Sequence, residues 1–356
     1  MGYTCISLSD ILREIDADAA GAPRTELQDV GNRIRNEHGY DYLAQKAIEI
    51  INASSDRKFV IDSIRNTHEI ETLKRVYSGF FLFAIWASSE IRWNRVSSKY
   101  SGNQTLFEED DKRDRDEKIE NGQQITLCYQ MADVVILNQD NTAAESFTKL
   151  KLIVKKYVDL IEKTEDFVPT EQETLMTMAY ANSLRSSCTQ RKVGALIIDE
   201  FGNVFSSGYN EVPTSERPCK MVYGKCYRKH LRELIDTDLG RVVQDESLVK
   251  TVSGIVKKHS KMLDYCRALH AEESAIVNMA RLSISAELSK ATLYTTTYPC
   301  NLCANKIVHV GIKRIIYFEP YPQIEAKEIL KAHRVEQIPF EGITFNGYFR
   351  FMEVLR

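Results

Sequence analysis

Two short segments in the last third of the sequence carry residue types that bind metal ions and move protons. Glu272 stands two positions after His270, and Cys300 and Cys303 are separated by two residues. Zinc takes imidazole nitrogens and thiolate sulfurs as ligands, and a catalytic zinc has three protein ligands and one position open for water. The pattern therefore predicts a zinc site held by His270, Cys300 and Cys303.

Glu272 is the residue expected to move protons at this site. Zinc lowers the pKa of its water toward neutrality, and a nearby carboxylate can take that proton, pass one to a ring nitrogen and help an amine leave as ammonia. A C-x2-C pair at the start of a helix places both sulfurs on one side of the first turn, where the helix dipole favours the Cys300 thiolate. The alternative is a structural zinc beside a surface His–Glu pair, but the joint occurrence of both segments favours catalysis.

The segments around these residues predict one sheet backed by helices. Two apolar strands, Val193–Asp199 and Val204–Gly208, flank a turn with Gly and Asn, which is typical of a hairpin. The other predicted elements are a helix capped near Thr170 and reaching Ser187, helix His270–Arg281, strand Ala291–Thr296, helix Asn301–Val310, strand Lys313–Phe318 and helix Glu325–His333.

The earlier part of the chain predicts a second α/β domain. Apolar runs rich in β-branched and aromatic residues predict buried strands at Lys58–Ile64, Phe80–Ala87 and Asp133–Leu137. Helical patterns accompany them at Thr25–Glu37, Asp41–Asn52, Glu69–Tyr77 and, as a connector, Ala143–Glu162. This alternation favours a parallel sheet. A boundary near Thr164–Pro169 divides the chain into domains of residues 1–165 and 166–356.

The run Glu108–Glu120 is the most highly charged stretch of the chain. Charge runs are typical of solvated surfaces, so a solvated loop or helix face is expected. The alternative interpretation is a mobile lid over a phosphate site.

Composition limits the class of protein. With 356 residues, of which 43% are hydrophobic, the chain can bury the cores of two ordinary domains. A net charge of -3 argues against a protein that mainly grips nucleic acid and favours an enzyme of small molecules. The eight scattered cysteines favour reduced thiols and metal sites. No signal sequence or membrane-length apolar run is seen, so we expect a cytoplasmic protein with no membrane contact.

The second domain resembles the deoxycytidylate deaminase family. H-x-E followed by P-C-x-x-C is the signature of zinc nucleobase deaminases. The likeness extends over most of residues 170–350 and includes Ser183–Cys188, Arg191–Ala195 and Gly208–Asn210. It implies a cytidine-deaminase-like sheet with backing helices.

The same resemblance implies substrate-binding residues. Asn210 is the first choice for a sugar hydroxyl, although a plain turn at a strand end is the alternative for Gly208–Asn210. The backbone at Ala271 is expected to contact the pyrimidine carbonyl, and Tyr298 and Tyr321 are further candidates.

A long insertion, Thr214–Ala268, separates the hairpin from His270. Some deoxycytidylate deaminases carry a second, structural zinc in the corresponding region. A tetrahedral set is available from Cys188, Cys219, Cys226 and either His230 or Cys266. The alternative is a group of unrelated cysteines.

The first domain resembles part of a P-loop nucleoside-kinase-like domain, at Asp62–Asn66, Glu69, Arg92 and Arg95. The phosphate-binding G-x4-G-K-[ST] loop is absent from the sequence, so phosphoryl transfer is not expected. A regulatory or scaffolding role is predicted instead.

Together with Glu319–Tyr321 and Phe340–Ile343, this organisation resembles bacterial anti-phage deaminases. The resemblance implies hydrolysis of dCTP as well as dCMP to deoxyuridine nucleotides, a homo-oligomer, and inhibition by an RNA or protein partner. Three alternatives remain: a housekeeping dCMP deaminase for thymidylate synthesis, a polynucleotide-editing deaminase, and a nucleotide-sensing assembly protein.

Overall fold

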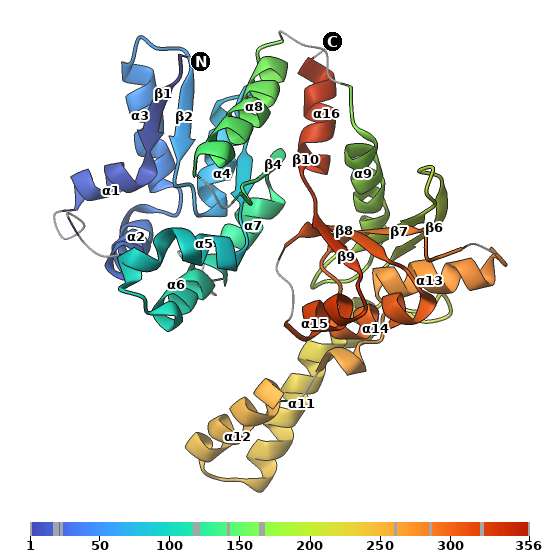
Figure 1. Ribbon diagram of the computed structural model, residues 1–356. Coiled ribbons are helices and arrows are strands. Elements are labelled where there is room, and N and C mark those ends of the chain that lie inside the picture. Colours follow the sequence, from blue (N-terminus) through green and yellow to red (C-terminus); the bar gives the residue numbers. More distant parts are fainter. Residues whose placement is uncertain are drawn as a thin grey trace. The chain divides into compact units, whose positions relative to one another are not determined.

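The chain folds into two compact mixed α/β units, Met1–Val168 with Glu341–Arg356, and Pro169–Phe340 (Figure 1). The computed structural model describes residues 2–16, 21, 24–116, 122–140, 143–163, 168–259, 262–284, 287–320 and 324–354. Within these ranges, no helix has the length and apolarity that crossing a membrane requires.

The first unit contains two small sheets. Strand β1 (Thr4–Ser7) pairs in parallel with β2 (Phe59–Asp62), and β3 (Phe83–Trp86) pairs in parallel with β4 (Val134–Leu137). The three predicted strands form, and β3 and β4 pair in parallel as expected. The single parallel sheet is wrong, because β2 pairs with β1, which was not predicted, in a separate two-stranded sheet. Burial was also predicted too broadly, since β2 and β3 contain exposed residues. The helices of this part are α1 (Leu8–Ile15), α2 (Arg24–His38), α3 (Tyr42–Ala53), α4 (Thr67–Val76), α5 (Ser89–Val96), η2 (Ser97–Tyr100), α6 (Gln104–Asp116), α7 (Ile125–Gln130) and α8 (Ala143–Ile161).

The start of α4 shows how local sequence fixes an element of this unit. The Asn66 side chain accepts a hydrogen bond from the backbone N–H of His68, at 3.0 Å. In return, Glu69 Oε2 accepts the backbone N–H of Asn66, at 3.1 Å. This reciprocal capping satisfies backbone donors that the first helical turn leaves free.

The charged run Glu108–Glu120 corrects a prediction. Up to Asp116 it belongs to α6, and three of its acidic side chains are buried: Asp110, Asp111 and Asp114. A solvated surface is therefore wrong for this face, because Asp111 pairs with Arg92 and Asp114 pairs with Arg65. Buried charges are stable only when paired in this way. Whether α6 acts as a lid stays a prediction.

Residues 341–356 were expected in the second domain, but they pack in the first unit. Strand β10 (Gly342–Ile343) runs antiparallel to β4, and α16 (Phe345–Val354) follows it. The physical reason is burial, since Ile343 and Phe351 share a core cluster with Val134, Ile136 and Tyr157. These contacts place the last residues with the strand β4 to which they are hydrogen-bonded.

The second unit has the single sheet that the sequence predicts. Its strand order is β6-β5-β7-β8-β9, with β5 antiparallel to both neighbours and β7, β8 and β9 parallel. The elements are α9 (Glu171–Ser183), β5 (Gly194–Ile198), β6 (Val204–Tyr209), α10 (Cys219–Tyr223), α11 (Tyr227–Val242), α12 (Glu246–His259), η3 (Met262–Tyr265), α13 (Ala271–Arg281), β7 (Thr292–Thr297), α14 (Asn301–Val310), β8 (Arg314–Glu319), α15 (Ile324–Ala332) and β9 (Glu336–Pro339).

Helices cover both faces of this sheet. Ala195, Ile197, Leu293 and Ile315 form one core cluster with side chains from α13, α14 and α15. Strand side chains alternate between the two faces, and on the opposite face the ring of Phe318 packs edge-on against Tyr180 of α9. The sheet is therefore buried on both sides, which fixes the strand ends that carry the functional residues.

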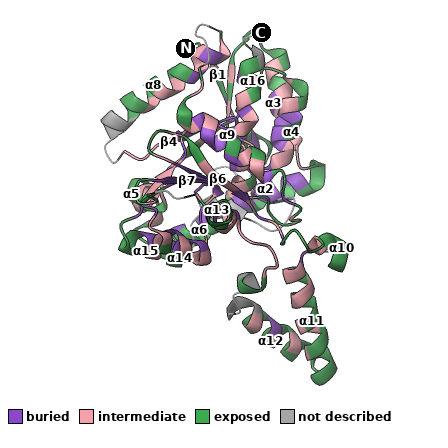
Figure 2. Cartoon of the chain, turned by 90° about the vertical axis from the view of Figure 1, so that its right-hand side faces the viewer, coloured by how far each residue is buried: buried purple, intermediate pink, exposed green. Residues whose placement is uncertain are grey.

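The insertion Thr214–Ala268 is largely helical. Helices α11 and α12 pack against each other in a hairpin that extends away from the sheet of this unit (Figure 1). Figure 2 shows that this hairpin is mostly exposed or half-buried, and α11 has no buried residue. The hairpin was not predicted, and it explains why the connection is longer than a simple loop.

Gly208 sets the distance between β6 and α13, and it supports a stability prediction. A Cβ atom at this position would lie 2.2 Å from the Ala271 carbonyl oxygen and 2.4 Å from the Ala275 backbone nitrogen. We expect Gly208→Ala to lower the free energy of unfolding by about 1–3 kcal/mol or more, because neither backbone atom can move freely. Denaturant unfolding of the purified chain measures this change.

Gly240→Ala is the matched control for Gly208→Ala. Gly240 lies in α11, and its added Cβ would meet nothing within 4 Å. This control should be neutral or stabilising by up to about 1 kcal/mol, since alanine favours the helix. Equal stability of the two variants would contradict the close approach of β6 and α13.

Candidate functional site

The predicted metal ligands lie at one edge of the second unit's sheet. Tyr209 at the end of β6 pairs with Gly194 at the start of β5, and Thr297 at the end of β7 pairs with Glu319 at the end of β8. Cys300 follows the end of β7 by three residues. The start of β5 and the ends of β6, β7 and β8 therefore lie at the same side of the sheet.

His270, Cys300 and Cys303 come together at this edge, as predicted. The donor atoms of the three side chains all lie within 4.8 Å of one another. His270 Nδ1 is 3.3 Å from Cys300 Sγ and 3.4 Å from Cys303 Sγ. Within the described part of the chain, this is the one group of three or more His, Cys, Asp or Glu residues with such spacing.

Helix starts position all three residues. His270 is the N-cap of α13, and its backbone N–H donates to Glu273 Oε2 at 3.4 Å. Cys300 is the N-cap of α14, and Cys303 lies buried in the first turn of the same helix. Unpaired backbone N–H groups at these helix starts favour thiolate sulfur. The predicted C-x2-C helix start is therefore confirmed.

The donor set fits zinc. Zn–S bonds of about 2.3 Å and Zn–N bonds of about 2.0 Å in a tetrahedron put sulfur and nitrogen roughly 3.5 Å apart. The two nitrogen–sulfur distances of 3.3 and 3.4 Å agree with this spacing. Three such ligands leave the fourth position free, which is the arrangement of a catalytic site.

The pKa values at the site show that it favours a positive charge. Hydrogen bonds with the sulfurs of Cys266 and Cys300 raise the pKa of His270 to about 10. The pKa of Cys300 is lowered to about 4. Its hydrogen bond with Cys303 has the largest effect, and its hydrogen bond with His270 also lowers the pKa. Both shifts indicate that these side chains stabilise positive charge, which a divalent cation bound to them would supply.

Glu272 lies beside the ligands and is not one of them. Its Oε2 is 3.5 Å from Cys303 Sγ, and its Oε1 is 3.4 Å from Oγ1 of Thr295 in β7. The side chain is only 4% exposed, and burial raises the pKa of its carboxyl group. A raised pKa suits a group that takes and returns a proton near neutral pH.

The side chain of Asn210 is engaged with the backbone beside the site. Its Oδ1 accepts the Val193 N–H at 2.7 Å, and its Nδ2 donates to the Arg191 carbonyl at 2.8 Å. These bonds hold the chain that enters β5 against the end of β6. Asn210 keeps one N–H and one lone pair with which it can contact a sugar.

The other predicted substrate residues have different surroundings. Ala271 is fully buried in the first turn of α13, where a backbone N–H has no intrahelical partner. The Tyr298 hydroxyl donates to Gln337 of β9, and the ring of Tyr298 packs edge-on against Tyr317. Tyr321 lies outside the described residues.

The cysteines proposed for a second zinc converge only in part. Cys188, Cys219, Cys226 and Cys266 line one small pocket, whereas the His230 ring stacks on Tyr223. Among the described residues, their sulfurs do not form a group with the spacing seen around His270. A second zinc therefore stays a hypothesis, with Cys266 a better candidate than His230 for the fourth ligand.

Sequence reasoning did not assign the roles of three contributors to the site. Cys266 hydrogen-bonds with His270, the kind of partner that fixes the orientation of a metal-binding imidazole. Thr295 lies against Glu272. Arg191 forms an ion pair with the buried Glu319 at the end of β8. The three threonines that end the strand TLYTTT, just before Cys300, were the available signal for Thr295. Cys266 and Glu319 stood out in the sequence for other reasons.

Comparison with known proteins agrees with this geometry. Residues 169–319 match the model of the cytidine and deoxycytidylate deaminase zinc-binding region. The deoxycytidylate deaminase of Schizosaccharomyces pombe is 28% identical over 293 residues, which cover 82% of this chain and 77% of that protein. A match of this length extends beyond the second unit into the first.

Two shorter proteins also match. The deoxycytidylate deaminase of Enterobacteria phage T2 is 32% identical over 154 residues, which cover 42% of this chain and 79% of that protein. The structure of the dCMP deaminase of cyanophage S-TIM5 in complex with dCMP and dUMP is similar at 22% identity and a TM-score of 0.33, covering 49% of this chain and 99% of that one. On the sequence matches and the assembled zinc-binding residues, this chain belongs to the deoxycytidylate deaminase family of zinc-binding hydrolytic enzymes.

Proposed function

We propose that the second unit removes the 4-amino group of a deoxycytidine nucleotide by hydrolysis, with His270, Cys300 and Cys303 as zinc ligands and Glu272 as the proton carrier. The observation that carries the proposal is the buried Glu272 carboxylate, 3.5 Å from a ligand sulfur and outside the ligand set. The relatives' names supply the substrate class, because both matched sequences are deoxycytidylate deaminases.

The chemistry assigns two proton transfers to Glu272. Zinc, when bound, supplies a Lewis acid that makes water a nucleophile near neutral pH. Glu272 accepts a proton as the water oxygen adds to C4 of the base, and it delivers that proton to ring N3. It then carries the proton of the new hydroxyl group to the amino nitrogen. The C4–N bond breaks, ammonia leaves, and a deoxyuridine nucleotide remains.

Neighbouring groups hold the reacting atoms in place in this proposal. The Ala271 backbone contacts the pyrimidine carbonyl, and Asn210 contacts the sugar through its remaining donor and acceptor. Thr295 orients the Glu272 carboxylate, and the Cys266 sulfur orients the His270 ring. Tyr298 and Tyr321 complete the proposed substrate contacts.

The number of phosphates on the substrate gives the first test. We expect the zinc-loaded chain to convert dCMP to dUMP, and the resemblance to anti-phage deaminases extends the proposal to dCTP. Each nucleotide is incubated separately, and the products are resolved by chromatography. Turnover of dCTP supports depletion of the nucleotide pool in defence, whereas turnover of dCMP alone supports a housekeeping enzyme for thymidylate synthesis.

Two substrate controls separate this function from its alternatives. Single-stranded DNA or tRNA deaminated faster than free nucleotides would replace the proposal with polynucleotide editing. Failure to deaminate any deoxycytidine nucleotide would favour the nucleotide-sensing assembly protein.

The wider biology of the chain is also a proposal that rests on resemblance. It comprises a cytoplasmic homo-oligomer, an inhibitory RNA or protein partner, and a P-loop kinase-like first domain with a regulatory or scaffolding role. In the structure, β1 passes directly into α1 at Leu8, which agrees with the absence of a phosphate-binding loop there.

A further inference from the structure

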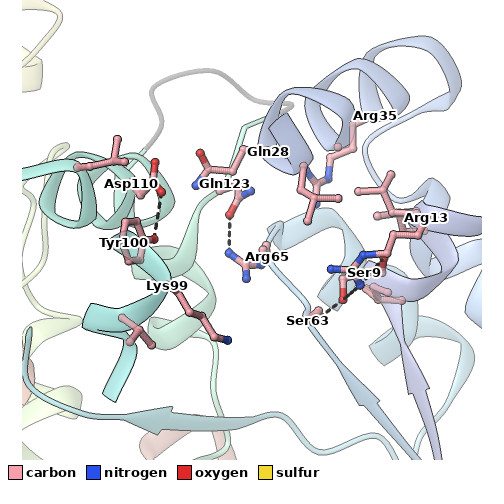
Figure 3. A pocket seen from close by; sticks show the side chains of 17 residues that line it. Ser9, Arg13, Gln28, Arg35, Ser63, Arg65, Lys99, Tyr100, Asp110 and Gln123 are labelled. Atoms are coloured by element: carbon pink, nitrogen blue, oxygen red, sulfur yellow. Dashed lines mark hydrogen bonds between the residues drawn. The ribbon is translucent and has the colours of Figure 1, made fainter. Parts of the chain in front are cut away.

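The first unit contains a cavity of about 570 Å³ at the carboxyl ends of its parallel strands β1 and β2 (Figure 3). Ser7 and Asp62, which end these strands, are paired neighbours. Just beyond them, the hydroxyl oxygens of Ser9 and Ser63 lie 3.4 Å apart in the cavity wall. Carboxyl ends of parallel strands are the usual place for ligands in open α/β sheets.

Basic side chains predominate among the charged residues of the wall. Arg13, Arg35, Arg65 and Lys99 line the cavity, against the single carboxylate of Asp110. Asp110 accepts a hydrogen bond from the Tyr100 hydroxyl, at 3.0 Å. Figure 3 shows Lys99 and Arg65 on one side of the space and Arg13 with Ser9 on the other. The arrangement favours an anionic ligand.

Carboxylates outside the lining pair with all three arginines without using all their donors, and Arg13 pairs with Asp10 at 2.7 Å. Arg65 pairs with Asp114 at 2.9 Å and also donates to Gln123 at 2.8 Å. Arg35 donates through Nε and Nη2 to the buried Glu69, at 3.1 and 2.9 Å. A guanidinium has five N–H donors, so each keeps donors for a ligand.

Two buried polar atoms in this wall have no hydrogen-bond partner in the described part of the chain. They are Nη1 of Arg35 and Oε1 of Gln28, whose residues are 3% and 1% exposed. Buried polar groups are nearly always satisfied, so each such atom requires an explanation. An acceptor on a ligand would satisfy Arg35, and a donor would satisfy Gln28.

Other parts of the wall also suit a binding site, because leucine side chains make it apolar and the backbone of one residue is strained. Leu8, Leu12 and Leu43 are buried leucines that line the cavity. Ser63 has a φ angle of +63°, a conformation that residues other than glycine rarely adopt and that often marks a ligand site. The volume falls within the range of small-molecule pockets.

We propose that this cavity binds a nucleoside monophosphate, or a small molecule of the same chemistry: a phosphate, a flat apolar body and a hydrogen-bond donor. The phosphate meets Arg35 Nη1, Arg65, Lys99 and the two serine hydroxyls. The base packs against the leucines, with its donor on Gln28 Oε1. Nothing in this proposal depends on the deaminase residues, all of which lie in the second unit.

The test is nucleotide binding by the zinc-loaded full chain. AMP, GMP and dTMP are the probes, because none carries the 4-amino group of cytosine; adenosine and inorganic phosphate separate the two halves of the ligand. Calorimetry should show that at least one nucleotide binds more tightly than either half, with affinity that falls as salt rises. Hydrogen exchange should slow in residues 8–15 and 59–65.

Two variants sharpen the assignment. Lys99 is exposed, so Lys99→Met should fold and should weaken binding about tenfold, the loss of one charge-assisted contact. Arg35→Lys keeps a charge beside Glu69 but removes the fork that carries Nη1, and it should also weaken binding. The controls are Lys112→Met, at an exposed position on α6 outside the wall, and Arg33→Lys, on the same helix as Arg35.

Three results would overturn the proposal. The first is no binding of any probe at millimolar concentration, and the second is protection confined to residues 210–303. The third is unchanged affinity in Lys99→Met. If Arg35→Lys does not fold, the exchange data on the unaltered chain and the affinity of Lys99→Met still decide whether the cavity binds a nucleotide.

Discussion

Glu272→Ala is expected to abolish deamination while the chain keeps its zinc. The side chain is buried beside the ligand Cys303 and is not part of the ligand group. Removing a general acid–base that acts in both proton transfers should cost about 100- to 10,000-fold in kcat. Glu272→Gln should lose a similar factor, because an amide keeps the shape but cannot carry the proton. Steady-state rates and metal analysis on the same preparations measure both effects.

Glu328→Gln is the control for this prediction. Glu328 is an exposed carboxylate on α15, in the same unit, and its replacement should leave the rate unchanged. Zinc lost together with activity in both Glu272 variants would assign Glu272 to the metal site instead. A normal rate in Glu272→Ala would remove it from the mechanism.

Cys303→Ser is expected to lose both zinc and activity. Cys303 is 1% exposed, and its sulfur is one of three donors within 4.8 Å of one another. A serine hydroxyl is a poor substitute for thiolate on zinc. Loss of an outer partner of a zinc ligand already costs about 10- to 100-fold in affinity, so loss of a ligand should cost more. Elemental analysis after dialysis, with rates at added zinc, gives the result.

Cys5→Ser is the matched control, because Cys5 is an exposed cysteine of the first unit. It should keep full zinc and full activity. The same metal count decides the second-zinc hypothesis. Two zinc ions per chain, falling to one in Cys303→Ser, would support a structural zinc among Cys188, Cys219, Cys226 and Cys266. One ion per chain in the unaltered protein would exclude it. Full zinc in Cys303→Ser would contradict the assigned ligand set.

The metal ligands could be predicted because their spacing is a local property of the sequence. Cys300 and Cys303 share one helical turn, and Glu272 follows His270 at the start of another helix. The strand that precedes the second of these helices was also visible in the sequence, whereas the insertion precedes the first. Chemistry then restricts which side chains can share one site. Pattern and chemistry were therefore enough to bring together residues 30 positions apart in the chain.

The errors arose where partners lie far apart in the sequence. Asp111 and Asp114 of α6 can be buried because Arg92 and Arg65 neutralise them from other elements. Residues 341–356 return to the first unit because β4, some 200 positions earlier, offers a free edge and an apolar cluster. The charge and hydrophobicity of a short sequence window predict neither the arginine partners of α6 nor the packing of residues 341–356 on β4. The bonds that hold Asn210 to residues 191 and 193 are long-range in the same way.

The most direct test of the proposed active site is a side-by-side assay of the zinc-loaded chain and its Glu272→Ala variant on dCMP and dCTP, with ammonia and deoxyuridine products measured together. Our assignment predicts that the unaltered chain releases ammonia equimolar with dUMP from dCMP, and with dUTP where dCTP is also a substrate, and that a variant with equal zinc turns over at least about 100-fold more slowly. Equal rates in the two proteins, or no product from a fully zinc-loaded chain, would contradict it.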